Sequence, residues 1–304
     1  MSKKNRILLA LGGATVAAAA VGYFYAPARL FALAAAGRSP VCPLENALKA
    51  DENLRLQIRY KDQILSASRL IQKDPGFHLW DTPRGRWWIP EGDDWVLPYN
   101  LAEQERRIYG TGERSVKAGD IVLDCGANVG VYTRLALDAG AKTVVAIEPA
   151  PDNIESLRRN FPAEIASGRV ILVPKGVWDK KDVLNLSIDP QNTAADSFVI
   201  NQKATNKTIQ VPLVPIDELV ADLRLERVDY IKMDIEGAET NALAGGRQTL
   251  AKYHPRLSLA AYHLPTDPVR IPELVLAAWP GYRMECGPCA EAGGRVRPDV
   301  LYFR

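Results

Sequence analysis

The chain has 304 residues, of which 47% are hydrophobic and 24% are charged, and its formal net charge is +2. This is the composition of a globular protein with one large domain or two ordinary domains. The small net charge, together with the lack of a long basic run or of zinc-finger spacing, excludes the usual electrostatic basis for binding nucleic acid. We therefore expect no nucleic-acid partner.

The N-terminus combines a short basic cluster with a long uncharged segment. Basic residues lie within positions 3–6, and residues 7–26, which follow, carry no charge. Such a segment is long enough to span a bilayer, so we interpret residues 1–37 as a single-pass membrane anchor. A cleaved signal peptide is the alternative, because small residues around positions 34–36 offer cleavage sites. The basic cluster alone would place the rest of the chain outside the cytosol.

Residues 38–115 are interpreted as a linker, helices and an aromatic hairpin. Apolar residues have helical spacing at 44–48 and at 64–71, whereas residues 54–58 alternate as in a short strand and stay undecided. Residues 77–97 contain four tryptophans in alternating stretches that are broken by glycine turns, which predicts a β-hairpin. We interpret this hairpin as packed on the main domain, with stacking on a ligand as the alternative.

The main domain, residues 116–304, opens with a nucleotide-binding pattern. An apolar run ends at Asp124. A turn with Gly126, Asn128 and Gly130 follows and leads into a helical stretch. Strand, glycine turn and helix form the opening unit of an α/β sheet, whose ligands lie beyond the carboxyl ends of its strands. The glycines let the backbone approach a ligand closely, and the Asn128 side chain is suited to cap the helix.

Later strands bring further polar residues to the same edge. Residues 143–147 form an apolar strand that ends at Glu148, 24 residues after Asp124. An acidic residue at this position is placed to accept hydrogen bonds from ribose hydroxyls. The polar loop of residues 189–206, which contains Asp196, separates two further predicted strands. We interpret this loop as a lid or substrate loop.

An acidic strand end follows the predicted strand at residues 228–233. Asp234, Glu236 and Glu239 lie within six residues, a density that packing alone does not explain. The two glutamates could simply favour the N-terminus of the next helix. Asp234, in contrast, should project into the same cleft as Asp124.

The pair Cys286-Gly-Pro-Cys289 is the redox motif of thioredoxins. That motif needs a long helix after it, but residues 293–298 contain two glycines and a proline. We therefore interpret the pair as a loop, or as half of a metal site that would need further ligands. The loop would lie within a closing antiparallel pair of strands at 282–284 and 300–303.

The glycine spacing separates two classes of nucleotide site. Nicotinamide-dependent oxidoreductases use Gly-x-Gly-x-x-Gly after the first strand, which would need glycine at positions 128 and 131. Instead, Asp124-x-Gly126-x-Asn128-x-Gly130 resembles the first motif of Rossmann-like S-adenosylmethionine (SAM) methyltransferases. Together with residues 146–149 and 231–239, this pattern is similar to the FkbM family of methyltransferases. The similarity runs from about residue 80 to the C-terminus, and residues 231–239 are its most specific part.

The resemblance implies an α/β fold of the Rossmann-like class I methyltransferase type, here preceded by the N-terminal transmembrane helix. The sheet should be mostly parallel and seven-stranded, with an antiparallel C-terminal hairpin. The resemblance also implies methyl transfer from SAM, typically to a hydroxyl of a sugar or natural product, so we expect a small-molecule or glycan acceptor. The residues implied to hold the cofactor are Glu148 at the ribose, Trp178 near the adenine and, at the methionine end, Asp124, Gly126, Asn128 and Gly130.

The catalytic prediction concerns the end of the predicted strand at residues 257–262. His263 is our candidate general base, because an imidazole has a pKa suited to neutral pH. Asp234 and Glu236 are the alternative bases, and a hydrogen-bonded structural role is the alternative for His263. The same three residues could hold a divalent metal, but we expect catalysis without one.

Two other functions remain open, namely a membrane-tethered SAM- or nucleotide-binding module without catalysis and a nicotinamide-dependent oxidoreductase. The acidic residues at the strand ends argue against the first, and the glycine spacing argues against the second. Because SAM is made in the cytosol, we expect the catalytic domain to face the cytosol, against the simple charge rule.

Overall fold

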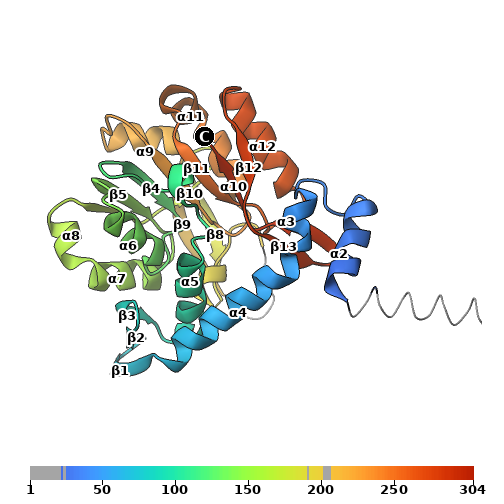
Figure 1. Ribbon diagram of the computed structural model, residues 1–304. Helices are drawn as coiled ribbons and strands as arrows, with labels where there is room; N and C mark the ends of the chain where they lie inside the picture. Colours follow the sequence, from blue (N-terminus) through green and yellow to red (C-terminus); the bar gives the residue numbers. More distant parts are fainter. Residues whose placement is uncertain (1–21, 23–24, 190–191, 201–206) are drawn as a thin grey trace, which may run out of the picture.

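The computed structural model describes residues 22, 25–189, 192–200 and 207–304 (Figure 1). Its central sheet has the strand order β12-β15-β11-β10-β4-β5-β6. The adjacent parallel strands are the apolar runs of the sequence: β4 (Ile121–Cys125), β5 (Thr143–Ile147), β6 (Val170–Val173), β10 (Tyr230–Met233) and β11 (Arg256–Ala260). The last strand, β15 (Val300–Phe303), runs antiparallel between β11 and β12 (Met284–Cys286). The predicted seven-stranded, mostly parallel sheet and its antiparallel C-terminal pair are confirmed.

Helices cover both faces of this sheet, which explains why its strands are apolar on both sides. Successive residues of β5 alternate between two hydrophobic clusters, since Val144 and Ala146 join one while Val145 and Ile147 join the other. The helices that pack into the first cluster are α5 (Val96–Glu105), α6 (Val131–Asp138), α7 (Pro151–Asn160) and α8 (Pro162–Ala166). Those of the second are α9 (Ile216–Asp222), α10 (Glu239–Ala244), α11 (Arg247–Tyr253) and α12 (Asp267–Ala278).

The N-terminal part of the described chain packs against the main domain. Its helices are α2 (Ala26–Ala35), α3 (Leu44–Leu48) and α4 (Ala50–Ser66), and they precede an antiparallel sheet of β1 (Arg69–Asp74), β2 (Phe77–Thr82) and β3 (Gly85–Pro90). A disulfide joins Cys42 to Cys289, and Arg29 forms an ion pair with Glu291. These links fasten the N-terminal helices, drawn in blue in Figure 1, to the hairpin of β13 (Cys289–Ala292) and β14 (Arg295–Pro298).

Two details of this part differ from the pattern in the sequence. Residues 54–58, which alternate like a strand, lie within α4. The helical interpretation of residues 64–71 is wrong beyond Ser66, because β1 begins three residues later and gains backbone hydrogen bonds to β2 as a third strand of the hairpin. As expected for a hairpin that packs on the main domain, Trp87 contacts Phe161 edge-on in the core.

A second small sheet lies between β6 and β10 in the sequence. Its strands are β7 (Gly176–Val177), β8 (Asp182–Ser187) and β9 (Thr208–Val214), in the order β7-β9-β8. The two strands predicted beside the polar loop are therefore confirmed. The described part of that loop, residue 189 and residues 192–200, contains the short helix η3 (Thr193–Ala195).

None of the helices within the described residues is long and apolar enough to cross a membrane. Most of the predicted anchor, residues 7–21 and 23–24, falls outside the described residues. The transmembrane helix is thus not part of the described fold, and the membrane location stays a prediction.

Candidate functional site

The turn after β4 needs glycine because other parts of the chain pack closely against it. Gly126 has a φ of +77°, and a Cβ atom there would lie 1.9 Å from the carbonyl oxygen of Asp234, just after β10. Gly130 has a φ of +95°, and a Cβ atom there would lie 2.2 Å from the ring of Phe161. The prediction that Asn128 caps α6 is wrong, because Gly130 is the N-cap residue and no side chain caps this helix.

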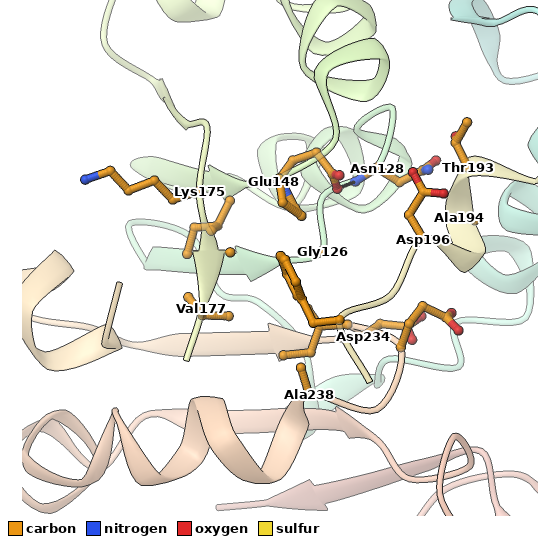
Figure 2. A pocket seen from close by; sticks show the side chains of 16 residues that line it. Gly126, Asn128, Glu148, Lys175, Val177, Thr193, Ala194, Asp196, Asp234 and Ala238 are labelled. Carbon is orange, nitrogen blue, oxygen red and sulfur yellow. Dashed lines mark hydrogen bonds between the residues drawn. The ribbon is translucent and has the colours of Figure 1, made fainter. Parts of the chain in front are cut away.

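Two adjoining clefts open at the carboxyl ends of the parallel strands. The narrow cleft has a volume of about 50 Å³ and the wide cleft about 430 Å³. Both are lined by Gly126, Asn128, Ala194, Asp234 and Glu236. Figure 2 shows the narrow cleft, whose other walls include Ile147, Glu148, Val177, Thr193, Asp196 and Phe198. The walls of the wide cleft include Trp95, Tyr99, Glu103, Tyr109, Lys232 and Tyr262.

Glu148 presents a fixed carboxylate to the narrow cleft. Its Oε2 accepts a hydrogen bond from the backbone N–H of Asn128 at 2.8 Å, and its Oε1 accepts one from the backbone N–H of Ala150 at 2.9 Å. Burial raises the pKa of Glu148, and these hydrogen bonds oppose the rise. The carboxylate is therefore oriented before any ligand arrives, beside the apolar walls of Ile147 and Val177.

Asp124 lies behind the glycine turn and pairs with Lys232. It is fully buried, its Oδ2 accepts a hydrogen bond from the Thr133 hydroxyl at 2.7 Å, and its Oδ1 is 3.5 Å from the Lys232 ammonium. The same ammonium donates to the carbonyl oxygen of Gly126 at 2.8 Å. Burial opposes the charge of Lys232, but Asp124 and Asp234 outweigh burial and raise its pKa. The buried pair thus supports the turn from within the sheet.

Among the residues that the structure describes, Asp124, Gly130 and Trp178 line neither cleft. Trp178 contacts Phe198 edge-on, with ring centroids 6.3 Å apart, and Phe198 is the residue that reaches the narrow cleft. The predicted contacts of these three residues with the cofactor stay predictions. Gly126, Asn128 and Glu148 are the predicted cofactor residues that the structure brings together at the cleft walls.

His263 is enclosed by three carboxylates. Its Nδ1 is 3.0 Å from Glu239 Oε1, and its Nε2 is 3.1 Å from Glu236 Oε1 and 3.3 Å from Asp234 Oδ1. Burial would lower the pKa of His263, but Glu239 and Glu236 outweigh burial and raise it well above its usual value. The imidazole is then protonated at neutral pH, so the arrangement does not favour it as a general base. The same protonation opposes metal binding, which needs a neutral imidazole.

Asp234 and Glu236 are the members of this group that reach the clefts. Asp234 accepts a hydrogen bond from the Tyr109 hydroxyl at 2.5 Å. Burial acts to raise the pKa of Asp234, but Lys232 and His263 outweigh burial and lower it. For Glu236 burial dominates over the contact with His263, and the pKa is raised. Asp234 is therefore a stable anion, whereas Glu236 is the stronger base.

The wall of the wide cleft that α5 and the residue before it form was not predicted from the sequence. Trp95, Tyr99 and Glu103 all line this cleft, and their spacing of four residues places them on one face of a helix. This spacing in the sequence could have indicated that the three side chains share one face of a helix. Burial and the nearby charge of Asp234 raise the pKa of Glu103 well above its usual value. The wide cleft thus carries aromatic rings and several acidic groups.

Residues 192–198, in the described part of the predicted lid or substrate loop, contribute side chains to both clefts. Asp93, in the short helix η1 (Asp93–Trp95), accepts hydrogen bonds from the backbone N–H of Thr193 at 3.0 Å and from its hydroxyl. Asp196 Oδ1 accepts a hydrogen bond from the backbone N–H of Asp189 at 2.7 Å, while Oδ2 is buried without a partner in the described chain. Burial raises the pKa of Asp196 to about 8.

We expect Asp196 to make the folded state less stable as pH rises. Its pKa of about 8 in the folded protein exceeds the value of about 3.9 for an unfolded chain. The folded state therefore binds more protons between these values, and stability that is present at low pH is lost as pH rises toward 8. The free energy of unfolding of Asp196→Asn, relative to that of the unmodified protein, should therefore be larger at pH 9 than at pH 5. Urea unfolding at both pH values measures this, and a gain equal to that of exposed Asp222→Asn would contradict it.

Comparison with known proteins adds independent findings. A family model described as "Methyltransferase FkbM domain" matches residues 124–283, more than half of the chain. The chain is 26% identical to 31-O-demethyl-FK506 methyltransferase FkbM of Streptomyces tacrolimicus, over 46% of this chain and 67% of the relative. It is also 26% identical to hexuronic acid methyltransferase AglP of Haloferax volcanii, over 52% and 62%, and 29% identical to 2-O-methyltransferase NoeI of Sinorhizobium fredii, over 45% and 61%.

A solved structure, methyltransferase FkbM from Methylobacillus flagellatus, has 19% sequence identity and a TM-score of 0.46, with 84% of this chain and 60% of that chain covered. The matches to the three sequence relatives named above span 61% to 67% of the lengths of those proteins.

Proposed function

Because the chain belongs to the FkbM methyltransferase family, we propose that it transfers a methyl group from SAM to a hydroxyl of a sugar or natural product. The acceptor class is supported by the relatives, which are named as methyltransferases of 31-O-demethyl-FK506, of hexuronic acid and of a 2-O position. One observation carries the proposal. The narrow and wide clefts share a single glycine turn, so a cofactor in one and an acceptor in the other would meet there.

The narrow cleft has suitable chemistry for SAM. Ile147, Val177 and Phe198 offer apolar walls for the adenine, and Glu148 offers an oriented carboxylate for the ribose hydroxyls. The amide nitrogen of Asn128 is buried and finds no partner in the described chain, so it is available to a carboxylate at the methionine end. When bound, SAM supplies a methyl group that is already activated on a sulfonium.

The wide cleft would hold the acceptor. Its tyrosines and Trp95 offer flat apolar faces together with hydroxyl groups, which suits a ring that carries several hydroxyls. Glu236 lines this cleft, and in the proposed reaction its carboxylate takes the proton of the acceptor hydroxyl. The imidazolium of His263 donates a hydrogen bond to Glu236 and orients that carboxylate. The main task of the protein is then alignment of donor and acceptor, with proton removal by Glu236.

Titration calorimetry of SAM with the full chain tests the cofactor. We expect Glu148→Gln to bind SAM about tenfold or more weakly, because hydrogen bonds to charged groups contribute roughly 1.5–3 kcal/mol. Glu226→Gln, at an exposed position, is the matched control and should bind as the unmodified chain does. Equal affinities for all three proteins would contradict the assignment of Glu148.

Transfer of a labelled methyl group tests the reaction itself. The acceptors would be a hexuronic acid, neutral glycosides and an O-demethylated natural product. Transfer to one of these supports the proposal. Tight SAM binding without transfer to any of them would favour the alternative of a binding module.

A further inference from the structure

Cys42, near the N-terminal helices, meets the two cysteines of the Cys286-Gly-Pro-Cys289 motif. Cys42 and Cys289 form a disulfide across 247 residues of sequence, and Cys286 is a free thiol. The sulfur atoms of all three lie within 4.8 Å of one another. The Cys286 thiol donates to the carbonyl oxygen of Val41, the residue before Cys42. A free thiol is thus within reach of a disulfide.

We propose that this cluster is a thiol–disulfide exchange site, at which Cys286 displaces Cys42 from Cys289. The Cys286 sulfur attacks as a thiolate and forms a new bond to the Cys289 sulfur. The bond between Cys42 and Cys289 breaks, and Cys42 leaves as a thiolate that takes up the proton released by Cys286. One disulfide replaces another, so no oxidant or reductant is consumed. The product closes the Cys-Gly-Pro-Cys motif, whose spacing is that of thiol–disulfide oxidoreductases.

A basic pocket opens onto Cys286 and gives it access to solvent. The pocket has a volume of about 280 Å³, and its walls include Lys49, Arg106, Arg107 and Arg114. Glutamates pair with two of these cations, Lys49 and Arg114, which leaves the pocket with a net positive charge. Thiols and disulfides that carry carboxylates, such as glutathione, have the charge that this pocket attracts. The same site therefore suits exchange with this class of small molecule.

The exchange would change how the N-terminal helices are held. It removes their covalent link to β13 and leaves the ion pair of Arg29 with Glu291 and the apolar cluster around Leu30. The last of these helices is α4. The side-chain amide of its residue Gln57 donates a hydrogen bond to the carbonyl oxygen of Tyr99 at 2.9 Å. Tyr99 lines the wide cleft. The cluster is therefore connected through α4 and α5 to the wall of the proposed acceptor site.

The exchange should be slow at neutral pH and faster in alkali. Burial raises the pKa of the Cys286 thiol to about 11, and the thiolate is the attacking species. Below that value the thiolate fraction, and with it the rate, should rise about tenfold for each pH unit.

Disulfide mapping of the full chain tests the proposal. The oxidised protein is incubated between pH 7 and pH 9 in a glutathione redox buffer, quenched in acid, alkylated, digested and analysed by mass spectrometry. We expect peptides linked through Cys286 and Cys289 to form at a rate that rises with pH. Cys286→Ser should keep only the link between Cys42 and Cys289, and Cys42→Ser should form the link between Cys286 and Cys289. Cys125→Ser, at a buried free cysteine, should behave as the unmodified chain.

Two results would overturn the proposal. The first is that the unmodified chain keeps only the original disulfide at pH 9 while Cys42→Ser leaves Cys286 and Cys289 both open to alkylation. The second is that the reduced protein binds one Zn²⁺ through all three sulfurs, measured by competition with a coloured chelator, because the cluster would then be a metal site. Neither result bears on methyl transfer, which is measured separately.

Discussion

Replacing Glu236 with glutamine should lower turnover by about 10²–10⁴-fold and leave SAM binding nearly unchanged, because general base catalysis contributes a factor of this size. Glu236 lines both clefts, and its pKa is raised by burial while that of Asp234 is lowered, so Glu236 is the stronger base of the two carboxylates that reach the clefts. Initial rates of methyl transfer and calorimetric SAM binding measure the two effects. Glu226→Gln is again the exposed control.

The pH dependence of turnover separates Glu236 from His263. If Glu236 is the base, turnover is lost as pH falls through its raised pKa, since the carboxylate must be charged to accept a proton. His263→Gln removes a positive charge 3.1 Å from Glu236, which raises the pKa of Glu236 further. This variant should therefore lose activity at neutral pH and regain it at higher pH. An equal loss at every pH would instead identify His263 as the base.

Replacing Lys232 with methionine should lower the free energy of unfolding by about 3–5 kcal/mol, the usual cost of removing one partner of a buried ion pair. Asp124 and Asp234 would both lose this nearby cation, which among their neighbours does most to favour their ionised forms against burial. Urea unfolding measures the loss. Lys142→Met, at an exposed position, should change stability by less than about 0.5 kcal/mol.

The double variant Lys232→Met with Asp124→Asn identifies the cause. It removes the unpaired charge of Asp124, so part of the lost stability should return. If the double variant is as unstable as the sum of the two single variants, the pair does not act as a unit.

The sheet could be predicted because its strands are buried on both faces. β5 is almost continuously apolar, and β4, β10 and β11 are mostly apolar. Short apolar segments of this kind are typical of strands that helices cover on both faces in an α/β domain. The location of the site could also be predicted, because the carboxyl ends of parallel strands meet at one edge of the sheet. This argument predicted that Asp234 faces the cleft, and the spacing after the glycine turn predicted the same for Glu148; both line the narrow cleft, whereas Asp124, predicted in the same cleft as Asp234, does not.

The partners of these residues could not be predicted, because they depend on contacts between distant segments. Lys232 was a charged residue in an apolar strand, which signals a buried partner but does not name Asp124. His263 was chosen for its ordinary pKa, and three surrounding carboxylates change that pKa. The disulfide joins residues that are 247 positions apart, and nothing local to Cys42 points to Cys289. Sequence patterns indicate which side chains are buried and toward which edge of the sheet they lie. Which side chains contact one another depends on the folded chain.

The position of β15 in the sheet sets an order in which the strands can assemble during translation. This strand lies between β11 and β12, yet it is the last strand of the chain. A protein emerges from the ribosome N-terminus first, so β12 cannot join the sheet before residues 300–303 have been made. Until then the edge of β11 is an unpaired strand of the kind that binds other chains. The growing polypeptide therefore exposes this edge from the synthesis of β11, at residues 256–260, until β15, at residues 300–303, has been made.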